Sequence, residues 1–299
     1  MVCARANGLD IEYETFGNRE DPPILLIMGL SAQMIAWPTD FCRMLASSGH
    51  FVVRFDNRDV GLSSKLEHLG VPDIMKIMAA FQEKKPVQAP YTLSDMALDV
   101  LGLMDALDLD KAHICGLSMG GMIAQVMAIE HPERMASLIS MESTTGEPDL
   151  PPAEPQARDA LFRAPPPDRE GYIAHMIRVF RSFAGGSNVF DEALERELSG
   201  LAYDRALYPV GFVRQLAAVL ASGGRRAALR SVSVPALVIH GADDPLLPVE
   251  HAKDTADAVP QARLLVVEGL GHGFSYPTLW QEIVNAIAEH TATTGQDAP

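Results

Sequence analysis

The segment Ile114–Gly121, ICGLSMGG, places one serine in a glycine-rich turn between an apolar run and a helical pattern. A serine hydroxyl becomes a nucleophile when a sharp strand-to-helix turn exposes it and a base removes its proton. Gly116 and Gly120 would leave room for such a turn, and the N–H groups of the next helix would favour negative charge there. The alternative is an ordinary turn in which Ser118 only caps the helix. We expect a nucleophile if the chain also supplies a base and an acid.

Two later loops offer that acid and that base. The loop HGADDPLLP starts at His240 and contains Asp243 and Asp244, and the loop GLGHGF contains His272. Both follow apolar runs, and open α/β sheets place their sites at the carboxyl ends of strands. The residue before a proline favours an extended backbone, which favours Asp244 over its neighbour as the acid. His272 lies between two glycines, so we expect its ring to turn freely; a solvated loop histidine is the alternative.

Apolar runs of four to seven residues alternate with helical patterns over most of the chain. Continuous apolar runs are typical of parallel strands that are covered on both faces. We expect strands over 24–28, 51–55, 112–115, 136–141, 236–240 and 263–267, and helices over 40–48, 92–107, 119–130 and 277–290. This alternation predicts an α/β fold with a mostly parallel, doubly wound sheet.

Two stretches interrupt the alternation. Residues 61–90 form a long connection with one helix-like piece, PDIMKIMAAF. Residues 145–230 are rich in proline at first, then become helical, and show no strand pattern. We therefore expect a core made of residues 1–144 and 231–299, with residues 145–230 forming a mostly helical cap.

The composition excludes several classes of function. The 299 residues carry a formal net charge of −15, so we expect no nucleic-acid partner, because phosphates require a basic surface. The longest apolar run is too short to span a membrane, and the first ten residues contain no apolar signal segment. Three scattered cysteines form no disulfide framework, and the histidines lack metal-binding spacing. These features predict a cytoplasmic protein without a metal site or a membrane span.

Motifs in a fixed order make the chain resemble the α/β-hydrolase superfamily over nearly its whole length. They are LLIMGLSAQMIAWP, HICGLSMGGMIAQ, PALVIHGADDPLLP and GLGHG. Within the superfamily, the MG loop with WP and the string DNRDVGLSS are similar to esterases related to aclacinomycin methylesterase. The resemblance implies the α/β-hydrolase fold, with the helical cap inserted after the sixth strand and roofing the site.

Carried over position by position, the resemblance assigns a catalytic triad. It implies Ser118 as the nucleophile, Asp244 as the acid and His272 as the base. It also implies an oxyanion hole formed by two backbone N–H groups, one from Leu30 and one from Met119.

The loop before Leu30 departs from the family pattern. Many relatives have His-Gly where this chain has Met28 and Gly29, which removes one hydrogen bond that would brace the loop. Because the oxyanion donors belong to the main chain, we still expect the hole to form. We also expect Gly29 and Trp37 to line the substrate pocket, with a buried packing role for Trp37 as the alternative. The segment 56–63 is expected to be a structural turn whose charged side chains bind backbone groups.

The implied activity is that of a serine carboxylesterase, which forms an acyl-enzyme and acts on a small-molecule ester without a cofactor. The subfamily suggests bulky polyketide or macrocyclic esters. A lactonase, a cofactor-free perhydrolase and a C–C bond hydrolase would keep the same triad, so these activities stay open. A non-catalytic hydrolase-like binding protein is a further alternative, although such proteins commonly lose a triad member. The sequence also leaves open whether the chain acts alone or as a homodimer.

Overall fold

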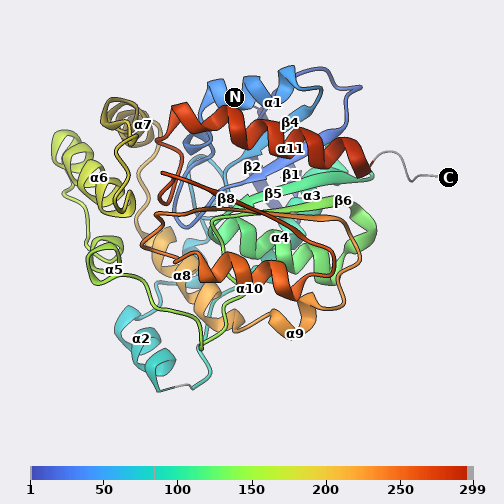
Figure 1. The fold of residues 1–299 in the computed structure, drawn as a ribbon. Helices are drawn as coiled ribbons and strands as arrows, with labels where there is room; N and C mark the ends of the chain where they lie inside the picture. Colours follow the sequence, from blue (N-terminus) through green and yellow to red (C-terminus); the bar gives the residue numbers. More distant parts are fainter. Residues whose placement is uncertain (1, 84, 295–299) are drawn as a thin grey trace.

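A twisted sheet runs through the centre of the structure, a computed structural model that describes residues 2–83 and 85–294 (Figure 1). Its strands are β1 (Val2–Ala6), β2 (Leu9–Phe16), β3 (Pro23–Ile27), β4 (Phe51–Phe55), β5 (Ala112–Leu117), β6 (Met135–Met141), β7 (Ala236–Gly241) and β8 (Arg263–Val267). Their spatial order is β1-β2-β4-β3-β5-β6-β7-β8. β2 pairs antiparallel with β1 and β4, and all other neighbours are parallel. Residues 1 and 295–299 of the predicted core lie outside the described residues.

Helices cover both faces of this sheet (Figure 1). One face carries α1 (Thr39–Ser47) and α11 (Trp280–Thr294), and the other carries α3 (Leu93–Ala106), α4 (Met119–Glu130) and α10 (Glu250–Ala258). A short helix, α2 (Ile74–Gln82), lies in the long connection after β4. Single 3₁₀ turns are η1 (Met34–Ala36), η2 (Glu67–Leu69), η3 (Pro132–Arg134) and η4 (Pro277–Leu279). With both faces covered, every side chain of β4, β5 and β7 is buried, which explains their continuous apolar sequences.

The predicted α/β-hydrolase fold with a mostly parallel sheet is confirmed, and the six predicted strands correspond to β3–β8. The hairpin of β1 and β2 was not predicted. These strands lie at the sheet edge, and β1 is largely exposed, so their sequences contain no long apolar run. The turn between them, Asn7 and Gly8, has φ values of 45° and 77°, as a two-residue hairpin turn requires.

Five helices lie between β6 and β7 in chain order: α5 (Pro155–Leu161), α6 (Arg169–Phe183), α7 (Glu192–Arg205), α8 (Val210–Ser222) and α9 (Arg226–Leu229). In Figure 1, α5, α6 and α7 stand beside the sheet, whereas α8 and α9 lie under it, in contact with α3 and α4. Arg214 of α8 is buried and forms a 2.7 Å ion pair with Asp59 of the core. The part of the insertion that stands away from the sheet is therefore α5–α7.

No helix within the described ranges is long and apolar enough to cross a membrane.

Candidate active site

Ser118 occupies a strained turn between β5 and α4. Its φ and ψ are 55° and −118°, a region that residues with side chains rarely adopt. Hydrogen bonds hold both sides of the turn: the Ser118 N–H donates to the Met141 carbonyl at 2.9 Å, and the Ser143 hydroxyl donates to the Ser118 carbonyl at 2.8 Å. A side chain at Gly120 would collide with the Ile27 carbonyl. The turn thus has the geometry that exposes a serine hydroxyl at the head of a helix.

His272 and Asp244 meet at the carboxyl ends of β8 and β7. His272 Nδ1 lies 2.7 Å from Asp244 Oδ2. The other carboxylate oxygen, Oδ1, accepts the N–H groups of Leu246 and Leu247 at 2.9 and 2.8 Å. Both residues are 5% exposed. Sequence reasoning chose Asp244 over Asp243, and only Asp244 contacts the imidazole among the described hydrogen bonds.

The expectation that the His272 ring turns freely is wrong. The ring is bound by Asp244, and the His272 N–H donates to the Phe183 carbonyl of α6 at 2.9 Å. A side chain at Gly271 would collide with that same carbonyl. The glycine therefore serves the close approach of α6 to the loop, and it does not make the histidine mobile.

Ser118 is half-buried, and no hydrogen bond joins its hydroxyl to the His272 ring within residues 2–83 and 85–294. Catalytic hydrogen bonds of this kind commonly tighten only when substrate is bound.

The electrostatics of the pair favour an ionised carboxylate and stabilise the protonated form of the imidazole beside it. Burial alone would lower the pKa of His272, but Asp244 and then Glu142 raise it above the ordinary value. Burial would raise the pKa of Asp244, yet the neighbouring His272 holds it below its usual range. Because the carboxylate can only accept, Nδ1 carries the hydrogen and Nε2 is left as the proton acceptor. This is the tautomer that a general base requires.

The loop after β3 lies against Ser118. A Cβ added to Gly29 would be 3.2 Å from the Ser118 Cβ. The Leu30 N–H finds no acceptor among the described residues, nor does the Met119 N–H at the start of α4, where helices leave donors unpaired. Two unpaired main-chain donors close to a serine hydroxyl are what an oxyanion hole uses.

Side chains from outside this loop hold its main chain in place. Asn57 Nδ2 donates to the Met28 carbonyl at 2.9 Å, Gln215 Oε1 accepts the Ser31 N–H at 2.7 Å, and Asp56 Oδ1 accepts the Met34 N–H at 2.8 Å. Gln215 is fully buried and its amide also donates to the Arg58 carbonyl at 2.9 Å. The brace that a histidine in place of Met28 would supply therefore comes from elsewhere. Gln215 lies almost two hundred residues from the loop, and no sequence pattern links the two.

Trp37 packs in the core. Its side chain is 0% exposed, and its ring lies 4.6 Å from that of Phe274 and 5.8 Å from that of Phe41, measured between centroids. The structure thus favours the alternative, a packing role, over contact with substrate.

The segment 56–63 is a structural turn. Asp56 and Asp59 accept the backbone N–H groups of Leu62 and Leu66, each at 2.8 Å. Arg58 donates to the Asp95 carbonyl at 2.9 Å and also forms a buried ion pair with Asp99.

Glu142, the first residue after β6, belongs to the site and was missed by sequence reasoning. It is completely buried, its Oε2 accepts the Gly273 N–H at 2.6 Å, and the same oxygen lies 3.9 Å from His272 Nδ1. Burial raises the pKa of Glu142 to about 8, although His272 opposes the shift. The string ISMESTTG contains no motif that would have marked this glutamate.

Glu142, Asp244 and His272 form the one group of potential metal ligands found within the described residues, with ligand atoms within 4.8 Å of one another. The Asp244 carboxylate already accepts three hydrogen bonds, and Glu142 Oε2 accepts one. These contacts describe a hydrogen-bonded acid–base cluster.

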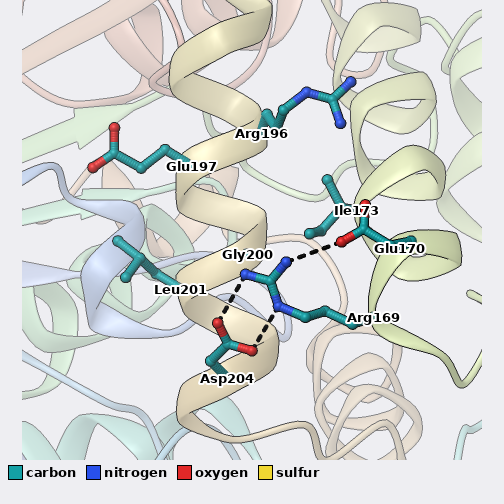
Figure 2. Close-up of a pocket in the computed structure, with 8 residues that line it drawn as sticks. All are labelled: Arg169, Glu170, Ile173, Arg196, Glu197, Gly200, Leu201 and Asp204. Atoms are coloured by element: carbon teal, nitrogen blue, oxygen red, sulfur yellow. Dashed lines mark hydrogen bonds and ion pairs between the residues drawn. The ribbon is translucent and has the colours of Figure 1, made fainter.

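A separate groove of about 310 Å³ lies between α6 and α7 (Figure 2). Arg169 crosses it and forms a bidentate ion pair with Asp204 at 2.8 and 2.9 Å. Arg169 also contacts Glu170 at 3.1 Å. The charges that line the groove are thus largely paired with one another, and none of the predicted site residues lies in it.

Comparison with known proteins gives consistent matches. The sequence model of the family described as the alpha/beta hydrolase fold matches residues 22–277. A rhodomycin D methylesterase of Streptomyces peucetius is 28% identical, with 93% of each chain covered. A 2-hydroxymuconate semialdehyde hydrolase of a Pseudomonas species is 30% identical, with 68% of each chain covered. The crystal structure of the enol-lactonase from Burkholderia xenovorans superposes with a TM-score of 0.71 at 22% identity, covering 97% of this chain and 100% of that chain.

Proposed function

Because the chain belongs to the α/β-hydrolase fold family, whose matching relatives are hydrolases, we propose that it is a serine carboxylesterase that acts through an acyl-enzyme on Ser118. One observation carries the proposal: the buried 2.7 Å contact between His272 Nδ1 and Asp244 Oδ2, in a loop cluster at the same sheet edge as the strained Ser118 turn. A binding protein would have no need of an oriented base at this place.

The reaction follows from these groups. His272 Nε2 takes the hydroxyl proton as Ser118 Oγ attacks the ester carbonyl carbon, and the N–H groups of Leu30 and Met119 bind the oxyanion. The intermediate collapses, and the leaving alcohol takes the proton from the imidazolium. A water molecule, deprotonated by the same nitrogen, then attacks the acyl-enzyme and releases the acid and Ser118. Asp244 fixes the tautomer of His272 and stabilises its charged form.

The substrate class we propose is a bulky small-molecule ester, such as a polyketide methyl ester. The support is the methylesterase relative, which aligns over 93% of this chain and of its own length. In the structure, α6 reaches the catalytic loop, since Phe183 accepts a hydrogen bond from His272 and Phe180 lies against Gly273. The helices that stand beside the sheet would therefore shape the space above Ser118 and select the acyl and alcohol groups.

Hydrolysis of a C–C bond is the second candidate, because the 2-hydroxymuconate semialdehyde hydrolase relative is 30% identical over 68% of the chain. It would use the same histidine and oxyanion donors on a vinylogous ketone in place of an ester.

A hydrolysis panel tests the proposal. We expect the wild-type protein to hydrolyse nitrophenyl esters and polycyclic methyl esters, and Ser118→Ala to remain folded with kcat lower by several orders of magnitude. Faster turnover of a ring-cleavage dienoate than of any ester would favour C–C hydrolysis. Enol-lactones and macrolactones complete the panel. Ser118→Ala with more than roughly a tenth of wild-type activity would refute the assignment of the nucleophile.

A further inference from the structure

A second carboxylate faces the histidine that the proposed mechanism uses as its base. Glu142 Oε2 is 3.9 Å from His272 Nδ1, on the side of the ring edge that also meets Asp244. The side chain is completely buried, and Oε1 has no hydrogen-bond partner among the described residues. The backbone of Glu142 has a positive φ of 44°. A buried, half-satisfied carboxylate on a strained residue destabilises the fold, so its presence calls for a role other than stability.

Glu142 is connected to the catalytic loop by a second contact. Its Oε2 accepts the N–H of Gly273, the residue directly after the histidine, at 2.6 Å. One side chain at the end of β6 therefore both anchors the loop that carries the imidazole and places a carboxylate oxygen near Nδ1.

We propose that Glu142 is a positioning residue for His272. Glu142 anchors the histidine loop and acts as a reserve acid, which accepts the Nδ1 hydrogen of His272 when Asp244 cannot. This inference rests on the proposed esterase function. The shift needed is small, because Glu142 Oε2 already lies 3.9 Å from His272 Nδ1. The proposed triad needs only one such acid, and a reserve would make this site less sensitive to loss of Asp244.

The charges around Glu142 determine how its pKa changes when Asp244 is replaced. The titratable groups that face it directly or through one neighbour are Asp244, His272, Tyr276, His240 and Glu195. Two close carboxylates resist being ionised together, and here burial and then Asp244 raise the pKa of Glu142, whereas Asp244 itself stays ionised. Replacing Asp244 by a neutral residue removes one cause of the raised pKa of Glu142. Glu142 then ionises at lower pH and can take over the role of the carboxylate.

The test is a double-mutant cycle with Asp244→Asn and Glu142→Gln, read as kcat between pH 6 and 9. Loss of the acid costs about 10⁴-fold in a serine protease that has no reserve. Here we expect Asp244→Asn to lose only on the order of 10–10²-fold, with activity rising as pH rises, because Glu142 becomes ionised. The double variant should lose a further 10²-fold or more and lack the alkaline rise. Glu142→Gln alone keeps an oxygen for the Gly273 N–H and should move the acid limb of the profile to lower pH.

Asp243→Asn in the same loop is the matched control, with an expected loss below about tenfold, because Asp243 makes no contact with the ring. Circular dichroism checks folding, and Glu142→Met replaces Glu142→Gln in the cycle if the glutamine variant does not fold. Equal activity and equal pH dependence of Asp244→Asn and the double variant would overturn the reserve-acid role while Ser118-dependent esterase activity remained. Absence of Ser118-dependent activity in the wild-type protein would instead overturn the proposed function, and this inference with it.

Discussion

In the proposed mechanism, the imidazole of His272 must lose and regain a proton near neutral pH. Burial alone would favour its neutral form, but the carboxylates of Asp244 and Glu142 outweigh burial and raise its pKa above the ordinary value of histidine. A protonated imidazole cannot accept the Ser118 proton, so the proposed mechanism makes the protein inactive in that form.

We therefore predict that kcat/KM falls on the acid side with an apparent pKa above that of free histidine, about 6.5. The loss should be reversible when the protein is returned to neutral pH. Initial rates on one nitrophenyl ester from pH 5 to 9 provide the measurement. A profile that stays flat well below pH 6 would exclude His272 as the base.

Residues with a local sequence signature could be named in advance, and others could not. Ser118, Asp244 and His272 each sit in a short glycine- or proline-marked motif after an apolar strand, and the sequence order alone relates them. Glu142 and Gln215 bind main-chain N–H groups of segments that are distant in sequence, and no motif around either residue indicates these contacts. Sequence reasoning could not identify residues whose position in the site depends on tertiary contacts alone.

At the scale of elements, α8 ties the insertion to the loop that carries Leu30. Gln215 accepts the Ser31 N–H at 2.7 Å and donates to the Arg58 carbonyl, so one side chain fixes two segments of the core. Ser31 has a positive φ of 60°, a conformation that its neighbours must hold in place.

Gln215→Ala should lower kcat by roughly tenfold or more with a smaller change in KM, because a displaced oxyanion donor weakens transition-state binding. Ser222→Ala, at the end of the same helix, is the control, since its hydroxyl bonds only within α8. Steady-state kinetics on a small ester separates kcat from KM. A change in KM alone would show that Gln215 does not position the donor.

The helix α6 is the element of the insertion that reaches the histidine loop. Phe183 is buried and its carbonyl holds the His272 N–H, whereas Phe180 is half-buried and faces Gly273. Phe180 is therefore the position where side-chain size can change without removing the hydrogen bond to His272.

We predict that Phe180→Trp lowers kcat/KM for bulky esters several-fold more than for nitrophenyl acetate, because added volume narrows the space beside the histidine loop. Leu201→Ala on the exposed side of α7 is the control. The two esters are compared in parallel on both variants. A uniform loss across both esters would mean that α6 does not set substrate size.

Most of the helices and strands of the core could be predicted from the sequence. Strands β3–β8 carry apolar runs because helices cover both faces of the sheet, and α4 spans the predicted residues 119–130. The hairpin β1–β2 was not predicted because both strands are partly exposed and neither contains a long apolar run.

The molecule as a whole contains buried histidines far from the catalytic loops. His113 on β5 and His290 on α11 are 5% and 3% exposed, and burial lowers the pKa of each to about 4. The unfolded chain, with ordinary histidines, takes up these protons between pH 6.5 and 4, while the folded chain does not. Because the unfolded state binds more protons in this window, stability falls as pH falls through it.

We predict that the free energy of unfolding drops by about 2 kcal/mol for each of these two histidines between pH 7 and 5. His113→Gln, which can keep the hydrogen bond to Ser137, should remove about half of this pH dependence. His68→Gln, at an exposed site, is the matched control. Urea unfolding at both pH values provides the measurement, and an unchanged pH dependence in His113→Gln would contradict the prediction.

The proposed role of Ser118 as the nucleophile can be tested directly, by mass spectrometry of the protein after treatment with a fluorophosphonate, which reacts covalently with an activated serine. We predict one adduct per chain, carried by the tryptic peptide of residues 112–134 and absent from Ser118→Ala. His272→Ala should react far more slowly, because the hydroxyl then lacks its base. An adduct on another residue, or no adduct from a protein that still hydrolyses esters, would contradict the assignment of Ser118 as the nucleophile.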